Sequence, residues 1–250
     1  MTRKRFESTA IFSLFFAVMF FSAQPAQAQD AKTKDSAAGT AKSRYAAMAP
    51  LEQYLMADRS AEIQLARSAG PEEIGRDASV LVLTAHGYET AASGKNGFVC
   101  LVERSWTAGI NDPDFWNPKL RGPLCLNAAA VRSYLPRTIK KTELAIAGRS
   151  REQIFAAIGA ALDKKELPSP EPGAMSFMLS KGGYLGDKAG GPWLPHVMFF
   201  ESETDGKAWG ADVPGSPIIT LQNPEERLTV FLVPVRSWSD GTAAQGGHSH

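Results

Sequence analysis

The sequence predicts an α+β fold, with a mostly antiparallel sheet of about six strands, N-terminal helices, and a helical insertion between the second and third strands. Short runs rich in β-branched and aromatic residues recur along the chain, and such residues favour strands. Several of these runs are apolar at consecutive positions, so both faces of the sheet must be covered. A block with helical caps and helical apolar spacing separates the second run from the third.

The N-terminus has the features of a cleaved secretory signal. Residues 3–5 are basic, 11–21 form an apolar run interrupted by one serine, and 26–28 read Ala-Gln-Ala, a small-x-small cleavage pattern. The run is shorter than the roughly 20 residues that span hydrocarbon, which disfavours a membrane anchor. We therefore expect a signal peptide over 1–28, a secreted or periplasmic mature protein, and no stable membrane insertion after cleavage.

The composition of the mature chain does not indicate a nucleic-acid or anionic-membrane partner. Removing the signal takes three basic and one acidic residue from totals of 27 and 26, which leaves 24 Lys and Arg against 25 Asp and Glu. This near-neutral balance gives no electrostatic reason to expect nucleic acid or an anionic membrane. A hydrophobic content of 44% allows one sizeable core.

The domain boundaries follow from local composition. Residues 29–44 contain almost no large apolar side chain and cannot offset the entropy of ordering, so they are predicted to form a disordered linker. One globular domain is expected over 45–238, followed by a polar, Gly-rich disordered tail over 239–250. Within the domain, Asp58 is predicted to cap a helix over 59–69.

The first two strands are predicted to form a hairpin with a long connection. The runs 79–84 and 98–102 are apolar, the segment between them is polar, and Asn96-Gly97 is a typical turn dipeptide. An irregular segment over 105–122 follows, and its aromatic residues argue against disorder.

The rest of the chain is assigned from caps and apolar runs. Asn127, Pro136 and Ser150 are predicted to begin three helices, over 128–135, 137–147 and 151–165. The four remaining strands are predicted over 175–179, 196–200, 218–221 and 228–235, the last two as a pair joined through Asn223-Pro224.

Cys100 and Cys125 are the two cysteines, and both lie in the exported part. An even count in an oxidising compartment predicts a disulfide, and two buried free thiols are the alternative. In the chain-entropy model, closing this loop stabilises the fold by about 3 kcal/mol.

Four stretches of the chain resemble a group of exported bacterial proteins that have no assigned activity. They read GKNGFVCLVERSW, FWNPKLRGPLC, PGAMSFMLSKGGYLGD and WSDGT, and the resemblance covers roughly 71–242. It implies export and a single globular domain, and it brings no catalytic residues.

Three residues are candidates for catalysis or metal binding. His86 and Glu89 follow the first strand, and His196 begins a later one. If these strand ends meet, the three residues could form a metal or acid–base site. The alternative is that each histidine is simply hydrogen-bonded at a strand end.

Other catalytic and cofactor classes lack support. No G-x-S-x-G elbow occurs, and a disulfide would remove the thiolate that cysteine catalysis needs. The glycines within 182–191 form neither a dinucleotide-binding motif nor a phosphate loop, and they precede a strand. We therefore expect no cofactor and predict no metal site of established pattern.

Aromatic residues in two loops are candidates for ligand binding. Trp106, Trp116 and Trp193 lie in the segments 105–122 and 181–193, with Arg121 close in sequence. Exposed rings could stack on a sugar, a peptide or a partner surface, and the alternative is that they cover one end of the core.

The leading hypothesis is a non-catalytic binding or structural module that recognises a small molecule, a glycan or a protein through these loops. The second hypothesis is a small exported hydrolase or metal-dependent enzyme that uses His86, Glu89 and His196.

Overall fold

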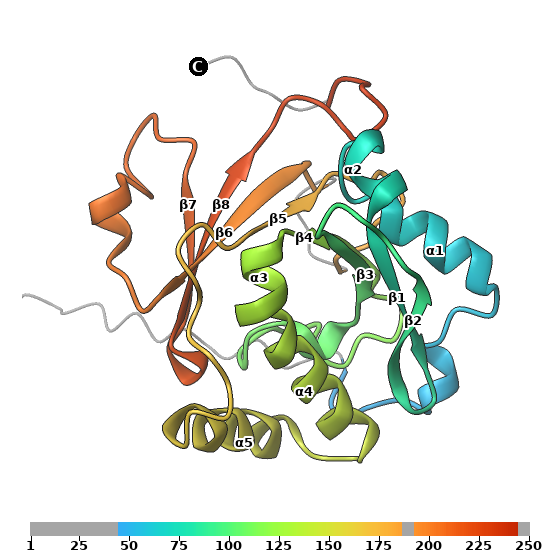
Figure 1. The fold of residues 1–250 in the computed structure, drawn as a ribbon. Coiled ribbons are helices and arrows are strands. Elements are labelled where there is room, and N and C mark those ends of the chain that lie inside the picture. Colours follow the sequence, from blue (N-terminus) through green and yellow to red (C-terminus); the bar gives the residue numbers. More distant parts are fainter. Residues whose placement is uncertain (1–44, 187–192, 245–250) are drawn as a thin grey trace, which may run out of the picture. The chain divides into compact units, whose positions relative to one another are not determined.

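An eight-stranded mixed sheet organises the chain (Figure 1). The computed structural model describes residues 45–186 and 193–244, which belong to one compact unit. The strand order is β2-β1-β3-β4-β5-β6-β8-β7. The strands are β1 (Ser79–Thr84), β2 (Gly87–Ala92), β3 (Val99–Glu103), β4 (Gly122–Leu126), β5 (Met175–Met178), β6 (His196–Ser202), β7 (Ile219–Asn223) and β8 (Leu228–Pro234).

The α+β class is confirmed, but the predicted six-stranded, mostly antiparallel sheet is wrong in detail. β1 does not form a hairpin with β3, because these two strands are parallel neighbours. β1 instead pairs antiparallel with β2 through a tight turn between Thr84 and Gly87. β2 was missed because it is an edge strand with exposed polar positions, which needs few apolar residues.

The other missed strand, β4, lies in the middle of the sheet and is buried at every position. It begins Gly-Pro, and both residues are typical of strand ends and loops. Pro123 lies opposite Val102 near the end of the β3–β4 ladder.

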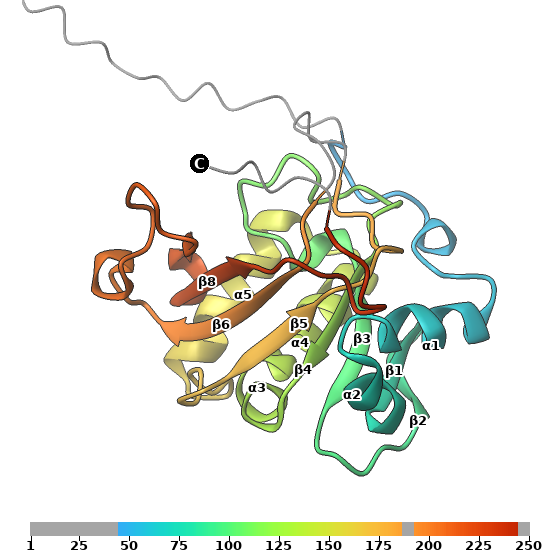
Figure 2. The same cartoon turned by 90° about the horizontal axis from the view of Figure 1, so that it is seen from above.

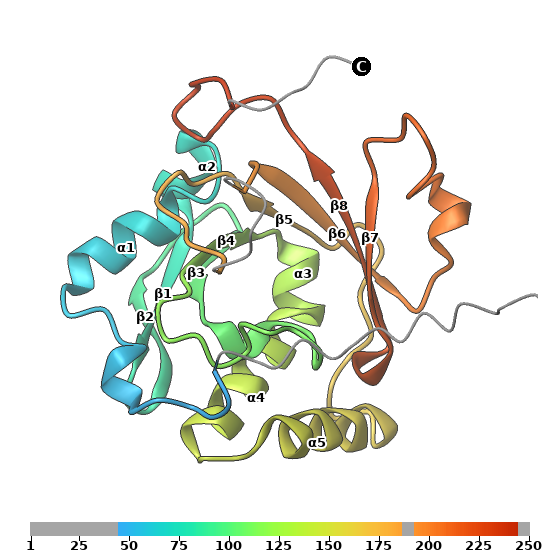
Figure 3. The same cartoon turned by 180° about the vertical axis from the view of Figure 1, so that it is seen from behind.

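Both faces of the central strands are covered, as the apolar runs predicted. Leu101 and Leu124 pack in one cluster with residues of the helical insertion. Cys100 and Val102 point to the other face, where they pack with Ala66 of the N-terminal helix. Figure 2 shows the two N-terminal helices, α1 (Arg59–Arg67) and α2 (Glu72–Asp77), near β1 to β3 and away from β8. Figure 3 shows β7 at the other edge of the sheet.

Three helices begin at the caps that the sequence predicted, whereas the helix predicted over 137–147 begins at Leu135 without a side-chain cap. The Asp58 side chain accepts a hydrogen bond from the Ser60 amide, Asn127 accepts one from Ala130, and Ser150 forms a capping box. The insertion lies between β4 and β5. The helices are α1 (Arg59–Arg67), α2 (Glu72–Asp77), α3 (Ala128–Ser133), α4 (Leu135–Ile146) and α5 (Arg151–Asp163), with short 3-10 helices η1 (Leu51–Gln53), η2 (Ser105–Thr107), η3 (Gly206–Trp209) and η4 (Pro224–Glu226).

The predicted disulfide is confirmed. Cys100 and Cys125 lie directly opposite each other in β3 and β4, and their sulfurs are bonded. Both residues are fully buried beside α1, so the bond joins two central strands on the face that this helix covers.

The structure tests only part of what the sequence predicts for the two ends of the chain. The predicted signal peptide over 1–28 and linker over 29–44 lie outside the described residues. The disordered tail predicted from Ser239 onward is wrong for its first part, since the Ser239 amide donates to the Leu179 carbonyl and the Trp238 amide to that of Thr242. Within 45–186 and 193–244, no helix combines the length and apolarity needed to cross a bilayer.

Candidate functional site

The three residues predicted for catalysis do not come together. His86 and Glu89 are exposed at the β1–β2 end of the sheet. His196 lies on β6, with β3, β4 and β5 between it and β1. β1 and β6 are separated by four strand spacings of about 4.8 Å, so their backbones lie roughly 19 Å apart. Among the described residues, no group of three or more His, Cys, Asp or Glu is placed to hold a metal ion.

His196 is a hydrogen-bonded histidine at a strand end. Its Nδ1 lies 2.8 Å from the Leu194 carbonyl oxygen, and its ring meets the Trp193 ring edge to face at 5.7 Å. Burial lowers the pKa of His196, so the imidazole is neutral at pH 7.

Two of the predicted ligand-binding rings belong to the core. Trp106 is fully buried, and its Nε1 donates to the Thr142 hydroxyl at 3.0 Å. Trp116 is also buried, edge to face with Phe115 at 4.7 Å. The prediction that these rings are open to a ligand is therefore wrong. They cover one end of the core, because burying a large aromatic ring removes much apolar surface from water.

The two predicted recognition loops do lie against each other. Arg121 and Tyr184 exchange two backbone hydrogen bonds of 2.8 Å. At Gly186, where φ is +136°, an added Cβ would lie 2.3 Å from an Asp114 carboxylate oxygen. Only a residue without a side chain permits this approach.

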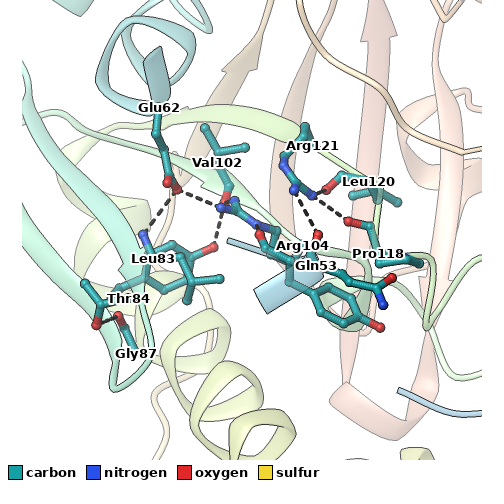
Figure 4. A network of polar contacts seen from close by, with 12 residues as sticks. Gln53, Glu62, Leu83, Thr84, Gly87, Val102, Arg104, Pro118, Leu120 and Arg121 are labelled. Atoms are coloured by element: carbon teal, nitrogen blue, oxygen red, sulfur yellow. Dashed lines mark hydrogen bonds and ion pairs between the residues drawn. The ribbon is translucent and has the colours of Figure 1, made fainter. Parts of the chain in front are cut away.

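The side chains of Arg121 and Trp193 each donate to backbone carbonyls of their own loop. The Arg121 guanidinium donates to the carbonyls of Pro118 and Leu120, and burial lowers its pKa to about 10 (Figure 4). Trp193 is half-buried, and its Nε1 donates to the Gly183 carbonyl at 3.2 Å. Both side chains therefore position the loops.

A buried ion pair fixes the start of the first loop. Arg104 Nη2 lies 2.9 Å from Glu62 Oε1, and this oxygen also accepts the Leu83 amide at 3.2 Å (Figure 4). Arg104 Nε donates to the Tyr54 carbonyl at 2.7 Å. The pair connects α1, β1 and the end of β3, and it therefore fixes the position at which the first loop leaves the sheet.

A cleft of about 710 Å³ opens between this loop and the last three strands. The strand registers place alternate apolar residues on its floor, because side chains opposite each other in an antiparallel ladder point to the same face. Met198 lies opposite Leu232, Phe200 opposite Val230, and Val230 opposite Leu221. We call these five residues the cleft floor.

Residues 107–113 form the wall that faces the floor. Buried Lys141 of α4 donates from Nζ to the carbonyls of Thr107 and Ala108, both at 2.9 Å. Arg151 of α5 donates to the Ile110 carbonyl, also at 2.9 Å. Two cations on the helical insertion therefore set the position of the wall.

The cleft contains one buried carboxyl group, that of Glu103, among the described residues that line it. Its Oε1 accepts a hydrogen bond from Thr138 at 3.1 Å, and its Oε2 accepts one from Thr107 at 3.3 Å. Burial raises the pKa of Glu103 to about 7, against the opposing effects of these hydrogen bonds and of Lys141. The group can therefore gain or lose a proton near neutral pH.

Tyr134 completes this end of the cleft. Its ring stacks on Phe200 with centroids 3.9 Å apart. Burial raises the pKa of Tyr134 well above its usual value, so the phenol keeps its proton. The cleft thus combines a large apolar floor with a protonatable group at one end, an arrangement suited to an amphipathic small molecule.

Sequence reasoning missed Glu103. Its signal was a carboxylate directly after an apolar strand, in a segment that continues into a loop. That pattern also fits an exposed strand end, and only the packing of α4 over the end of β3 makes the group buried.

Comparison with known proteins does not narrow the function. Neither a scan against protein-family models nor searches of curated proteins and of solved structures found a match to this chain.

Proposed function

We propose that this protein is an exported, non-catalytic binding module whose ligand occupies the cleft between residues 107–113 and the cleft floor. The ligand is a small amphipathic molecule with an apolar body over the floor and a hydrogen-bonding group at Glu103. The observation that carries this proposal is the pairing of an apolar strand face with a single buried carboxyl group in one cleft of about 710 Å³. Clefts of this size and lining are typical of small-molecule sites.

The placement of the other candidates supports binding through this cleft. Trp106 and Trp116 are buried, so the contribution of the first loop to recognition is the wall over residues 107–113. A hydrolase or metal-dependent enzyme built on His86, Glu89 and His196 has no geometric support, because these residues lie far apart on the sheet.

Export is the second part of the proposal. The Cys100–Cys125 disulfide supports an oxidising compartment, and the basic, apolar and small-residue pattern over 1–28 supports secretion.

The cleft is tested with N-phenyl-1-naphthylamine, an uncharged probe that fluoresces in apolar sites. Leu221→Lys places a charge on the floor at a position that is 46% exposed, so the fold should tolerate it. Ile219→Lys is the matched control, since it lies on the same strand and face, is 43% exposed, and is outside the cleft lining.

We expect saturable probe binding to the wild type and to Ile219→Lys. For Leu221→Lys we expect roughly tenfold weaker binding, since a charge there must be desolvated by the probe. Equal binding to all three proteins, or loss in both variants, would remove the cleft as the site.

A further inference from the structure

A second cavity, of about 290 Å³, lies beside the C-terminal end of α5. Three cationic side chains line it: Arg137 from α4, Lys165 just after α5, and Arg227 between η4 and β8. Ser169 and apolar residues of the proline-rich connector form the rest of the lining, and no carboxylate belongs to the described lining. The cavity is therefore electropositive.

Arg137 is the unusual member of this set. It is 2% exposed, yet its Nε and Nη1 have no hydrogen-bond acceptor among the described residues. Its ion-pair partner is Glu226, whose Oε2 lies 3.8 Å from Nε, too far for a hydrogen bond. A buried charged N–H group without an acceptor is costly, so these donors need an acceptor that the described residues do not supply.

The nearby charges leave an excess of positive charge. Glu226 Oε1 is already 2.8 Å from Lys141 Nζ, so one carboxylate serves two buried cations. Arg227, one of the lining cations, pairs in solvent with exposed Asp163. An exposed pair of this kind contributes little and can be exchanged for another anion.

The dipole of α5 explains only part of this cluster. Cations are favourable near a helix C-terminus, which accounts for Lys165 at the surface. The last carbonyls of α5 are already capped, by the amide of Lys165 on Leu162 and that of Glu166 on Ala161. The dipole does not explain why Arg137 of another helix is buried at the same place without acceptors for its Nε and Nη1.

We propose that this cavity binds a tetrahedral oxyanion, the phosphate or sulfate group of a small molecule, between Arg137, Lys165 and Arg227. Guanidinium groups match the geometry of such anions and bind them through charge-assisted hydrogen bonds. The cavity volume is roughly ten times the share of one water molecule in the liquid, so it has room for an anion with a small organic substituent. The cavity shares no lining residue with the cleft, so this proposal does not depend on the proposed function of the cleft.

The backbone offers variants that remove a cation without harming the fold. Lys165 has φ +60° and Arg227 has φ +48°, which is left-handed backbone that favours glycine. Lys165→Gly and Arg227→Gly should therefore fold at least as well as the wild type. Lys164→Ala is the control, because it removes the same charge from the neighbouring exposed residue outside the cavity lining.

Binding is measured by isothermal titration calorimetry with inorganic phosphate and sulfate, and in a second arm with glycerol 3-phosphate, at one ionic strength held with sodium chloride. We expect one saturable site in the wild type and in Lys164→Ala. In Lys165→Gly and in Arg227→Gly we expect roughly tenfold weaker binding, the effect of losing one charge-assisted contact.

The two arms separate the sources of the anion. Tighter binding of glycerol 3-phosphate assigns the site to a phosphate monoester, and equal or tighter binding of the inorganic anions assigns it to free anions, so both rankings support an oxyanion site. In ¹⁵N NMR spectra, the Arg137 Nε–H signal should shift on phosphate addition. The proposal is overturned if the wild type shows no saturable binding, if both glycine variants bind like the wild type, or if the Arg137 signal does not move.

Discussion

Lys141 Nζ lies 2.8 Å from Glu226 Oε1, a contact between residues 85 positions apart in the sequence. It joins α4 to η4, which precedes the last strand. The same ammonium group holds the wall of the cleft through the carbonyls of Thr107 and Ala108. One buried cation therefore connects the helical insertion, the loop after β3 and the C-terminal strands.

This contact predicts a large loss of stability in Lys141→Met. The substitution leaves Glu226 Oε1 buried without its cation and two loop carbonyls without their donor. Removing one partner of a buried ion pair typically costs about 3–5 kcal/mol. Urea unfolding measures the free energy of unfolding. Lys140→Met, at the neighbouring half-buried lysine, is the control and should change stability by less than about 1 kcal/mol. Similar values for the two variants would contradict a central role for Lys141.

Glu103 predicts a specific dependence of stability on pH. Burial raises the pKa of Glu103 in the folded protein to about 7, from an ordinary value of 4.5. The folded state therefore holds this proton more tightly than the unfolded state. The stability that Glu103 contributes is complete below about pH 4.5 and is lost as the pH rises through 7.

Glu103→Gln removes this titration and keeps an acceptor for Thr138. Relative to the wild type, the variant should gain about 2–3 kcal/mol of unfolding free energy between pH 5 and pH 8. Burial lowers the pKa of His196, which has the opposite pH effect, but this residue is common to both proteins and cancels in the difference. Exposed Glu89→Gln is the control and should show no such change. A wild-type and Glu103→Gln difference that stays constant with pH would show that Glu103 is ionised in the folded protein.

The disulfide predicts a stability loss without a change of fold. Replacing Cys100 and Cys125 together by alanine releases a loop with a sequence separation of 25 residues. The chain-entropy model gives a loss of about 3 kcal/mol. Guanidinium unfolding should show this loss, and dithiothreitol should lower the stability of the wild type but leave the double variant unchanged. An effect of dithiothreitol on the variant would trace the loss to something other than this bond.

The proposed export predicts a defined mature N-terminus. Cleavage after Ala28 leaves a protein that begins at Gln29. Mass spectrometry of the mature protein, recovered from outside the cytoplasm of an expressing bacterium, measures this end directly. Detection of a peptide that contains residues 11–21 in that fraction would exclude cleavage at this position.

Local features of the fold could be predicted from the sequence. The caps at Asp58, Asn127 and Ser150 depend on hydrogen bonds within three residues, so a short stretch contains all the information. The pairing of Cys100 with Cys125 followed from their even count in a chain that the sequence predicts to be exported. The two-sided covering of the central strands followed from their consecutive apolar residues.

The sheet pairing and the candidate sites were decided by tertiary structure. Nothing local distinguishes a parallel β1–β3 pair from a hairpin, because the choice depends on β2 taking the outer edge. Similarly, Glu103, Arg137 and Lys141 are ordinary charged residues in the sequence. They become buried only when α4 packs over the sheet and η4 closes against it. The pKa of a carboxyl group and the partners of a cation depend on solvent exclusion by distant segments, and no short stretch of sequence contains that information.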